Sequence, residues 1–210
     1  MPKQAVKHPL FARAYAKLAA HEDARGGFEN RQELLAGLTG RVVEVGAGIG
    51  SNFAHYPAGV TEVVAIEPEP YLRAKAEEAA AAAPVPVRVV EGLADALPLE
   101  DESVDAAVAS LVLCSVPDQA VALAELRRVI RSGGELRFYE HVLSNRASRR
   151  RVQRFMDATF WPRIAGGCHM TRDTRGAMEQ AGFMVQRSRR FPFPPGTFGI
   201  PHILGSARRP

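Results

Sequence analysis

Cysteine is scarce in this chain of 210 residues, which contains only Cys114 and Cys168. Two cysteines are too few for a disulfide framework, and neither belongs to a Cys-x-x-Cys pair. The sequence therefore predicts a reducing, cytoplasmic setting and a fold that depends on its hydrophobic core rather than on cross-links.

A long apolar run is also missing. No stretch approaches the roughly 20 apolar residues of a membrane-spanning helix, and Met1–Leu10 lacks the apolar core of a signal peptide. Hydrophobic residues make up 46% and charged residues 24% of the chain, as in ordinary globular proteins. We expect a single domain spanning residues 1–210, without a transmembrane segment.

Aromatic side chains do not interleave with the basic ones. The formal net charge is +4, and much of the excess lies in two groups of arginines. Such groups attract nucleic acid or anionic lipid, but without aromatic rings to stack on bases we expect no nucleic-acid partner. A solvated, arginine-rich surface is the simpler interpretation. The groups are Arg146, Arg149, Arg150, Arg151 and Arg154, and Arg187, Arg189, Arg190, Arg208 and Arg209.

What the chain does contain is an alternation of short β-branched runs with longer helical stretches. This alternation is typical of a parallel sheet with crossover helices, and we expect a turn and a helix after each of the first four strands. The clearest helices are Tyr71–Ala83, which stops before Pro84, and Asp118–Ile130, with Asp118 as its N-cap. The five predicted core strands are Arg41–Val45, Glu62–Ile66, Val87–Glu91, Val104–Ala109 and Glu135–His141.

Two flanking parts depart from this repeat. Residues 1–40 have a helical pattern and predict an N-terminal cap on a core of residues 41–142. Residues 143–210 predict helices on the acceptor side and two more strands, with a proline-rich loop between the strands that is long enough to fold over a pocket. The predicted parts are a basic helix around Arg146–Thr159, a short helix ending near Gly182, strand Val185–Arg190, loop Phe191–Thr197 and strand Ile200–Arg208.

The strongest local motif is the run Glu44-Val45-Gly46-Ala47-Gly48-Ile49-Gly50-Ser51-Asn52, which follows the first strand. Glycines suit a cofactor that lies against bare backbone, where a Cβ atom would collide with it, and the N–H groups of a following helix would face that ligand. Strand–glycine–helix turns also serve nicotinamide and flavin cofactors, so this turn alone does not choose among them.

The spacing of the glycines favours S-adenosylmethionine (SAM) over a dinucleotide. A dinucleotide motif needs Gly-x-Gly-x-x-Gly, but Gly50 comes one residue early and Asn52 fills the third slot. Glu44 suits a role in orienting the loop or the cationic amine of SAM. Glu67, at the end of the second strand, suits a carboxylate that holds two ribose hydroxyls. A nucleotide-dependent oxidoreductase and a non-catalytic SAM-binding module remain the alternatives.

These residues, taken with three later motifs, resemble the signature series of the class I SAM-dependent methyltransferases, in their methyltransferase type 11 branch. The later motifs are Gly92–Pro98, Ser103–Asp105 and Leu126–Gly134. The resemblance covers about Arg41 to Val142. It implies an α/β, Rossmann-like fold, with seven strands in a mostly parallel sheet, the last strand antiparallel and helices on both faces.

The resemblance also implies which residues bind SAM and release S-adenosylhomocysteine. Many relatives have an aspartate where this chain has Leu93, so either Asp95 or backbone groups would hold the adenine. The cofactor-binding residues that we expect are Glu44, Gly46, Ala47, Gly48, Gly50, Asn52, Glu67, Pro68, Leu93, Ala94, Asp95, Ser110, Leu111 and Val112.

A narrower resemblance is to the microsomal thiol S-methyltransferases and their bacterial relatives. It is carried by Leu111–Val116, Glu140–Val142, Gly167–His169, Thr171–Asp173 and Pro201–Ile203. The likeness implies a small-molecule acceptor, apolar and with a thiol favoured. Methyl transfer to an oxygen or nitrogen of a small metabolite is the alternative. Those microsomal proteins have a hydrophobic N-terminal anchor, which we expect this chain to lack.

Three polar residues are expected at the acceptor side, where the fourth and fifth strands end: Cys114, Glu140 and His141. His141 is the first candidate for a general base or a thiolate-stabilising group, with a packed structural histidine as the alternative. Cys168-His169 lacks a second ligand pair, so we expect no metal site. Aromatic residues that suit either an apolar acceptor cavity or plain core are Phe155, Phe160, Trp161, Phe191, Phe193 and Phe198.

The basic helix has one further interpretation. Phe155, Met156 and Phe160 lie opposite several arginines, an arrangement that suits peripheral contact with an anionic membrane. An ordinary amphipathic surface helix has the same pattern and is the favoured interpretation. The sequence does not indicate an oligomeric state.

Overall fold

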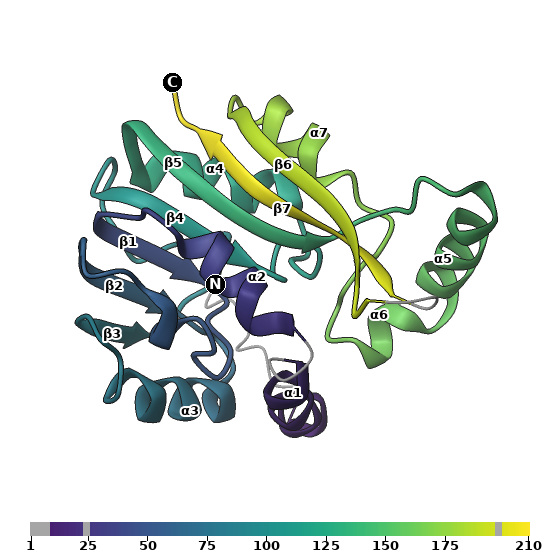
Figure 1. Ribbon diagram of the computed structural model, residues 1–210, viewed down its shortest axis with the longest axis horizontal. Coiled ribbons are helices and arrows are strands. Elements are labelled where there is room, and N and C mark those ends of the chain that lie inside the picture. Colours follow the sequence, from purple (N-terminus) through teal and green to yellow (C-terminus); the bar gives the residue numbers. More distant parts are fainter. Residues whose placement is uncertain (1–8, 23–25, 196–198) are drawn as a thin grey trace.

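The centre of the molecule is a seven-stranded sheet with the order β3-β2-β1-β4-β5-β7-β6 (Figure 1). The computed structural model describes residues 9–22, 26–195 and 199–210. Five strands run parallel, and β7 is antiparallel to both of its neighbours, β5 and β6. The predicted fold class is therefore confirmed. The strands are β1 Gly40–Val45, β2 Val60–Ile66, β3 Val87–Val90, β4 Val104–Ser110, β5 Ile130–His141, β6 Met184–Phe193 and β7 Ile200–Arg208.

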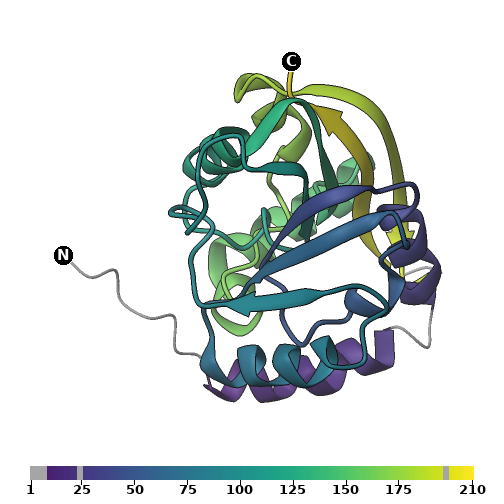
Figure 2. The same cartoon turned by 90° about the vertical axis from the view of Figure 1, so that its left-hand side faces the viewer.

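Helices cover both faces of the sheet. On one face α4 and α7 pack against β1, β4 and β5, and on the other α2 and α3 pack against the same strands and β2. In Figure 2, α1 and α3 lie together along one side of the sheet, and the two helices are in contact. The helices are α1 Pro9–Glu22, α2 Phe28–Leu35, the 3-10 helix η2 Phe53–His55, α3 Pro70–Ala80, α4 Gln119–Val129, α5 Ala147–Thr159, α6 Trp161–Ile164 and α7 Thr174–Gln180.

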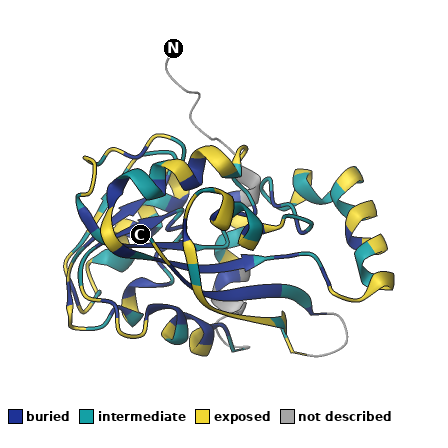
Figure 3. Ribbon diagram, turned by 90° about the horizontal axis from the view of Figure 1, so that it is seen from above, coloured by how far each residue is buried: buried dark blue, intermediate teal, exposed yellow. Residues whose placement is uncertain are grey.

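Burial on both faces explains the continuous apolar runs of the central strands. Val42, Val43 and Val45 of β1 are fully buried, and Val43 lies opposite Val64 of β2 and Ala107 of β4. A strand of a covered parallel sheet reads as an unbroken run rather than as an alternation. The central strands are accordingly dark blue in Figure 3.

Both predicted core helices are present, with shorter bounds. The Asp118 carboxylate accepts hydrogen bonds from the N–H groups of Ala120 and Val121, so Asp118 is the N-cap of α4 as predicted. The N-cap of α3 is Glu69, whose carboxylate accepts from the Leu72 N–H group. The helix ends at Ala80 rather than Ala83, because the residue before a proline avoids the helical region and the last residues before Pro84 form a turn.

The predicted helix after each of the first four strands is wrong in two places. After β1 the chain passes through a series of turns and then only the short helix η2. Residues 91–103, all of which the structure describes, join β3 to β4 without a helix. This short connection contains Gly92 and Pro98, which favour turns over helix.

The predicted loop Phe191–Thr197 is also wrong in its first half. Strand β6 continues to Phe193, with Phe191 opposite His202 and Phe193 opposite Ile200. Pro192 is tolerated because β6 lies at the edge of the sheet, where one side of a strand needs no ladder hydrogen bonds. Residues 196–198, which include Phe198, lie outside the described residues.

Helix α5 extends from one end of the molecule, beyond the sheet (Figure 1). Gln153 is its one buried residue, whereas Val152 and Phe155 are exposed, and most of the helix is yellow or teal in Figure 3. The helices found among the described residues are all too short or too polar to cross a membrane.

Candidate functional site

A cavity of about 520 Å³ opens at the carboxyl ends of β1, β2 and β4, the edge at which open α/β sheets bind ligands. Helix α1 contributes Tyr15 to its wall, and the loop after α6 contributes Gly166. The other lining residues come from the segments that follow the parallel strands. They are Gly46, Gly48, Ile66, Glu67, Pro68, Glu69, Leu72, Gly92, Leu93, Ala94, Asp95, Ser110, Leu111, Val112, Ser115, Val116 and Pro117.

The glycine turn after β1 can form only with residues that accept a left-handed backbone. Gly46, Gly48 and Gly50 have φ angles of 63°, 59° and 80°. A Cβ atom at Gly46 would lie 2.3 Å from Cγ2 of Val112, and one at Gly50 would lie 2.7 Å from the Phe53 ring. The turn therefore needs glycine both for its conformation and for its close packing.

Glu67 connects this turn to the start of α3. One carboxylate oxygen accepts the Gly48 N–H group at 2.8 Å, and the other accepts the Glu69 N–H group at 2.9 Å. Burial raises the pKa of Glu67 to about 7, against the two backbone donors that lower it. The carboxylate lines the cavity, and Glu69 rather than Glu67 caps the helix.

Glu44 lies behind the turn and does not line the cavity. Its carboxylate accepts the Asn52 side-chain amide at 2.8 Å and the Tyr56 hydroxyl at 2.6 Å, and Arg31 donates to the Asn52 oxygen at 3.0 Å. Burial raises the pKa of Glu44 to about 7. Glu44 and Asn52 therefore hold the turn in shape from the protein interior.

The segment after β3 forms another part of the cavity wall. Leu93 and Ala96 form a short antiparallel bridge, in which the Ala96 N–H group donates to the Leu93 carbonyl at 3.1 Å. Leu93, Ala94 and Asp95 all line the cavity, so the three residues expected beside the adenine lie together.

The loop after β4 forms the floor of the cavity, and Glu140 of β5 holds it. One carboxylate oxygen accepts the N–H groups of Val112 and Leu113 at 3.0 and 2.8 Å, and the other accepts the Cys114 N–H group at 3.0 Å. Glu140 is fully buried, which raises its pKa against these three donors. Leu111 has a φ of 59°, so the chain turns sharply there. Ser110 lines the cavity, and its buried hydroxyl has no hydrogen-bond partner in the described part of the chain.

Next to this loop, Cys114 and Cys168 meet His141. The two sulfur atoms lie 3.7 Å apart, and Nδ1 of His141 lies 3.6 Å from the Cys114 sulfur and 3.3 Å from the Cys168 sulfur. The Cys168 sulfur, and then burial, raise the pKa of Cys114 to about 12, whereas the Cys114 thiol lowers the pKa of Cys168. The sequence predicted that Cys114 and His141 share a sheet edge, but no sequence signal connected them to Cys168.

Ten of the fifteen predicted site residues line the cavity. The five that do not are Glu44, Ala47, Gly50, Asn52 and His141. Nine lining residues were not predicted. Seven of them lie in or near the same strand ends as the predicted residues, but Tyr15 comes from a helix that precedes the sheet and Gly166 from a loop far along the chain. The position of either residue beside the cavity depends on tertiary packing and leaves no local pattern in the sequence.

The predicted aromatic residues that the structure describes do not line this cavity. Phe155 and Phe160 are exposed, and Phe191 and Phe193 surround His202, with ring centroids 5.9 and 5.7 Å away. Phe193 is buried and packs as part of the sheet edge.

The cavity fits SAM by the chemistry of its walls. The glycine turn offers bare backbone, since Gly46 and Gly48 both line the cavity. Glu67 offers a carboxylate that suits ribose hydroxyls, and the unpartnered hydroxyl of Ser110 points to a polar ligand group.

The comparisons with known proteins agree with this geometry. A family model described as a methyltransferase domain matches residues 43–138. Thiol S-methyltransferase TMT1B of Mus musculus is 35% identical over 94% of this chain and 82% of its own length. TMT1A of Homo sapiens is 34% identical over 86% of this chain and 75% of its own length. A SAM-dependent methyltransferase structure from Thermotoga maritima has a TM-score of 0.68 at 20% identity, over 95% of this chain and 98% of that chain.

Proposed function

Because the chain belongs to the class I SAM-dependent methyltransferases, we propose that it transfers the methyl group to the sulfur of small, apolar thiols. The observation that carries the proposal is the extent of the likeness to thiol S-methyltransferase TMT1B. That likeness spans 94% of the chain, and so includes segments on the acceptor side as well as the cofactor core.

The lining of the cavity supports a thiol acceptor. The basic or acidic side chains among its described residues are Glu67, Glu69 and Asp95, all on the side expected for the cofactor. The part after β4 is mostly apolar, with Leu111, Val112 and Val116, and offers no such side chain as a base. A hydroxyl or amine acceptor needs a base within hydrogen-bond reach, whereas a thiol needs little beyond loss of its proton.

We propose the following roles for the residues of this chain. Glu67 holds the ribose, Gly46 and Gly48 give the ligand room against the main chain, and Ser110 donates or accepts one hydrogen bond. SAM supplies an activated methyl group on a sulfonium and leaves as S-adenosylhomocysteine. Residues 41–142 are the cofactor core, residues 1–40 are an N-terminal cap on it, and residues 143–210 shape the acceptor side.

We also propose a cytoplasmic location. The support is that the chain has only two cysteines, too few for the disulfide framework that an oxidising compartment favours.

The test is a panel of acceptors matched in size: a short alkane thiol, benzenethiol, phenol and aniline. With SAM in excess, release of S-adenosylhomocysteine is measured for each acceptor. We expect both thiols to react at least tenfold faster than phenol and aniline.

Two results would contradict the proposal. Faster methylation of phenol or aniline would show an oxygen or nitrogen acceptor. Tight binding of SAM with no product from any acceptor would show a non-catalytic SAM-binding module.

A further inference from the structure

Three strong metal ligands meet beside the cavity, although they are far apart in sequence. The ligand atoms of Cys114, His141 and Cys168 all lie within 4.8 Å of one another. Cys114 follows β4, His141 ends β5 and Cys168 follows α6, so the fold itself brings them together.

Their separations are those of three vertices of a tetrahedral zinc site. Zinc binds thiolate sulfur at about 2.3 Å and imidazole nitrogen at about 2.0 Å, which places two such sulfurs about 3.8 Å apart and a sulfur about 3.5 Å from a nitrogen. Here the sulfurs are 3.7 Å apart, and the two sulfur–nitrogen distances are 3.6 and 3.3 Å. Two thiolates and an imidazole are also the donors that favour zinc.

The backbone on either side of the sulfurs is fixed by hydrogen bonds. The Cys114 N–H group donates to Glu140, and the Cys114 carbonyl accepts the His169 N–H group at 2.7 Å. The Cys168 N–H group donates to the Ala165 carbonyl at 3.0 Å. Such support holds ligands in place before a metal arrives, which is what a metal site requires.

We propose that Cys114, His141 and Cys168 bind one Zn²⁺ ion and leave its fourth position open to the sulfur of the acceptor. Among the described residues, the group contains no fourth cysteine, histidine or carboxylate. Three protein ligands with an open position are typical of catalytic zinc, whereas structural zinc has four. The role of the open position rests on the proposed thiol acceptor, but the metal site itself does not.

The location suits this role. Ser115 lines the cavity, and its hydroxyl lies 3.6 Å from the Cys114 sulfur. Gly166, two residues before Cys168, also lines the cavity. The three ligands do not line the cavity themselves, and the group lies directly behind the wall that Ser115 and Gly166 form, with His141 only partly buried.

Zinc at this position would solve the problem of activating the acceptor. A thiol that binds there releases its proton to solvent and stays as a thiolate. Its sulfur forms the new bond to the methyl carbon, and the electron pair of the broken carbon–sulfur bond remains on the sulfur of S-adenosylhomocysteine. The thioether product is neutral and binds zinc less strongly, so it can leave.

The experiment begins with metal alone. The full-length protein is reduced, stripped with a chelator and titrated with Co²⁺, followed by back-titration with Zn²⁺. We expect one equivalent of Co²⁺ to give the visible bands of a tetrahedral ion and a near-ultraviolet thiolate charge-transfer band, and Zn²⁺ to abolish both. A protein that binds no stoichiometric metal after reduction, or that is isolated as a Cys114–Cys168 disulfide and still binds none once reduced, would overturn the proposal.

Variants identify the ligands. Cys168→Ser and His141→Gln should each weaken Co²⁺ binding at least tenfold, and Cys168→Ser should lower the charge-transfer band. The matched control is His169→Ala, which removes the neighbouring histidine outside the group and should bind Co²⁺ like the unmodified protein. Because Cys114 is fully buried, the test does not depend on Cys114→Ser, and circular dichroism checks the fold of every variant. Equal Co²⁺ affinity in Cys168→Ser would overturn the assignment.

The acceptor role has its own measurement. Adding the alkane thiol to the Co²⁺ protein should increase the charge-transfer band, while phenol should leave it unchanged. If thiol leaves the spectrum unchanged although thiols are methylated, the open position does not bind the acceptor. If Co²⁺ binds but no thiol is methylated, the metal site stands and the proposed acceptor fails.

Discussion

At the residue scale, two buried glutamates, Glu44 and Glu67, lie beside the glycine turn. Their side chains point to different surroundings. Glu67 lines the cavity, whereas Glu44 points into the interior and is held by Asn52 and Tyr56. Both have a pKa raised to about 7 by burial. They therefore form a matched pair in which one side chain can touch a ligand and the other cannot.

We predict that Glu67→Ala weakens the binding of S-adenosylhomocysteine at least tenfold, or by about 1.4 kcal/mol or more. The substitution removes the proposed ribose acceptor and also the acceptor for the Gly48 N–H group. Isothermal titration calorimetry at pH 8 measures the affinity. Glu44→Gln is the control and should bind within threefold of the unmodified protein. Undiminished binding by Glu67→Ala would refute the ribose assignment.

Also at the residue scale, Glu140 holds the loop after β4 in its conformation by accepting three of its N–H groups. We predict that Glu140→Gln destabilises the protein by about 1–3 kcal/mol, because an amide cannot accept all three of the N–H groups that the carboxylate accepts. Amide hydrogen exchange at Leu113 and Cys114 should become faster. Glu135→Gln, on the same strand but more exposed, should leave that exchange unchanged. Unchanged exchange at Leu113 and Cys114 in Glu140→Gln would contradict the prediction.

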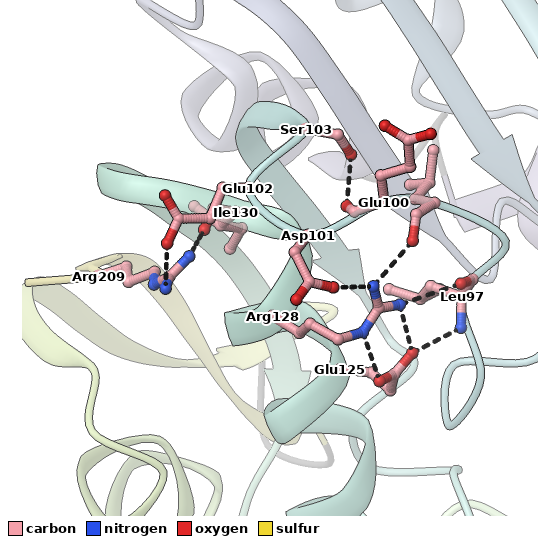
Figure 4. A network of polar contacts seen from close by, with 10 residues as sticks. Leu97, Glu100, Asp101, Glu102, Ser103, Glu125, Arg128, Ile130 and Arg209 are labelled. Atoms are coloured by element: carbon pink, nitrogen blue, oxygen red, sulfur yellow. Dashed lines mark hydrogen bonds and ion pairs between the residues drawn. The ribbon is translucent and has the colours of Figure 1, made fainter.

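At the element scale, the connection between β3 and β4 lacks a helix and depends on one arginine of α4 (Figure 4). Arg128 donates to the carbonyls of Leu97 and Leu99 and to the carboxylates of Asp101 and Glu125. Leu93–Asp95, at the start of this connection, line the cavity. Arg128 therefore fastens the segment that forms one cavity wall.

We predict that Arg128→Ala lowers the free energy of unfolding by about 1–3 kcal/mol, because two backbone carbonyls lose charged donors. Arg131→Ala is the control. The Arg131 side chain is 61% exposed and makes one ion pair, with Asp105, so its loss should cost less than about 1 kcal/mol. Urea unfolding of both variants measures the difference. Equal effects would show that the network contributes no more than a surface ion pair.

The elements that the sequence predicted correctly are those that local chemistry determines. Asp118 caps α4 because its own carboxylate reaches the next N–H groups, and the apolar run of β1 needs no distant partner to be recognised. The helix expected after Gly50 is reduced to the short helix η2, because the three glycines hold successive turns before it. The length of β6 depends on its pairing with β7, a partner that local propensity does not include.

At the scale of the whole molecule, the site is an assembly of strand ends. The family resemblance implied a mostly parallel sheet, so residues after each strand could be expected at one edge, and ten of those predicted line the cavity. The contributions of Tyr15, Gly166 and Cys168 depend on how α1 and the segment after α6 fold back on that edge. Long-range packing decides this, and no spacing in the sequence encodes it.

The folded molecule as a whole should respond to pH through its buried acids. Glu44 and Glu67 hold protons more tightly when folded than when unfolded, so their contribution to stability is full below pH 4.5 and is lost as the pH rises through about 7. Burial lowers the pKa of His202 to about 3. This histidine has the opposite pH dependence, because its contribution to stability is full above pH 6.5 and is lost as the pH falls toward 3. Because the two effects overlap between pH 4.5 and 6.5, a stability profile of the unmodified protein alone cannot separate them.

A variant of one acid separates these effects. In Glu44→Gln the amide can still bond to Asn52 and Tyr56 but cannot ionise, so at pH 5 the variant should be about as stable as the unmodified protein. At pH 8 the unmodified protein carries the cost of a buried carboxylate near Asn52, Tyr56 and Arg31, and the variant does not. We therefore predict that the free energy of unfolding of Glu44→Gln, relative to that of the unmodified protein, is about 2–3 kcal/mol higher at pH 8 than at pH 5. Urea unfolding without ligand measures both proteins at both pH values. A constant difference across this range would mean that Glu44 keeps an ordinary pKa, and that its hydrogen bonds and Arg31 offset its burial.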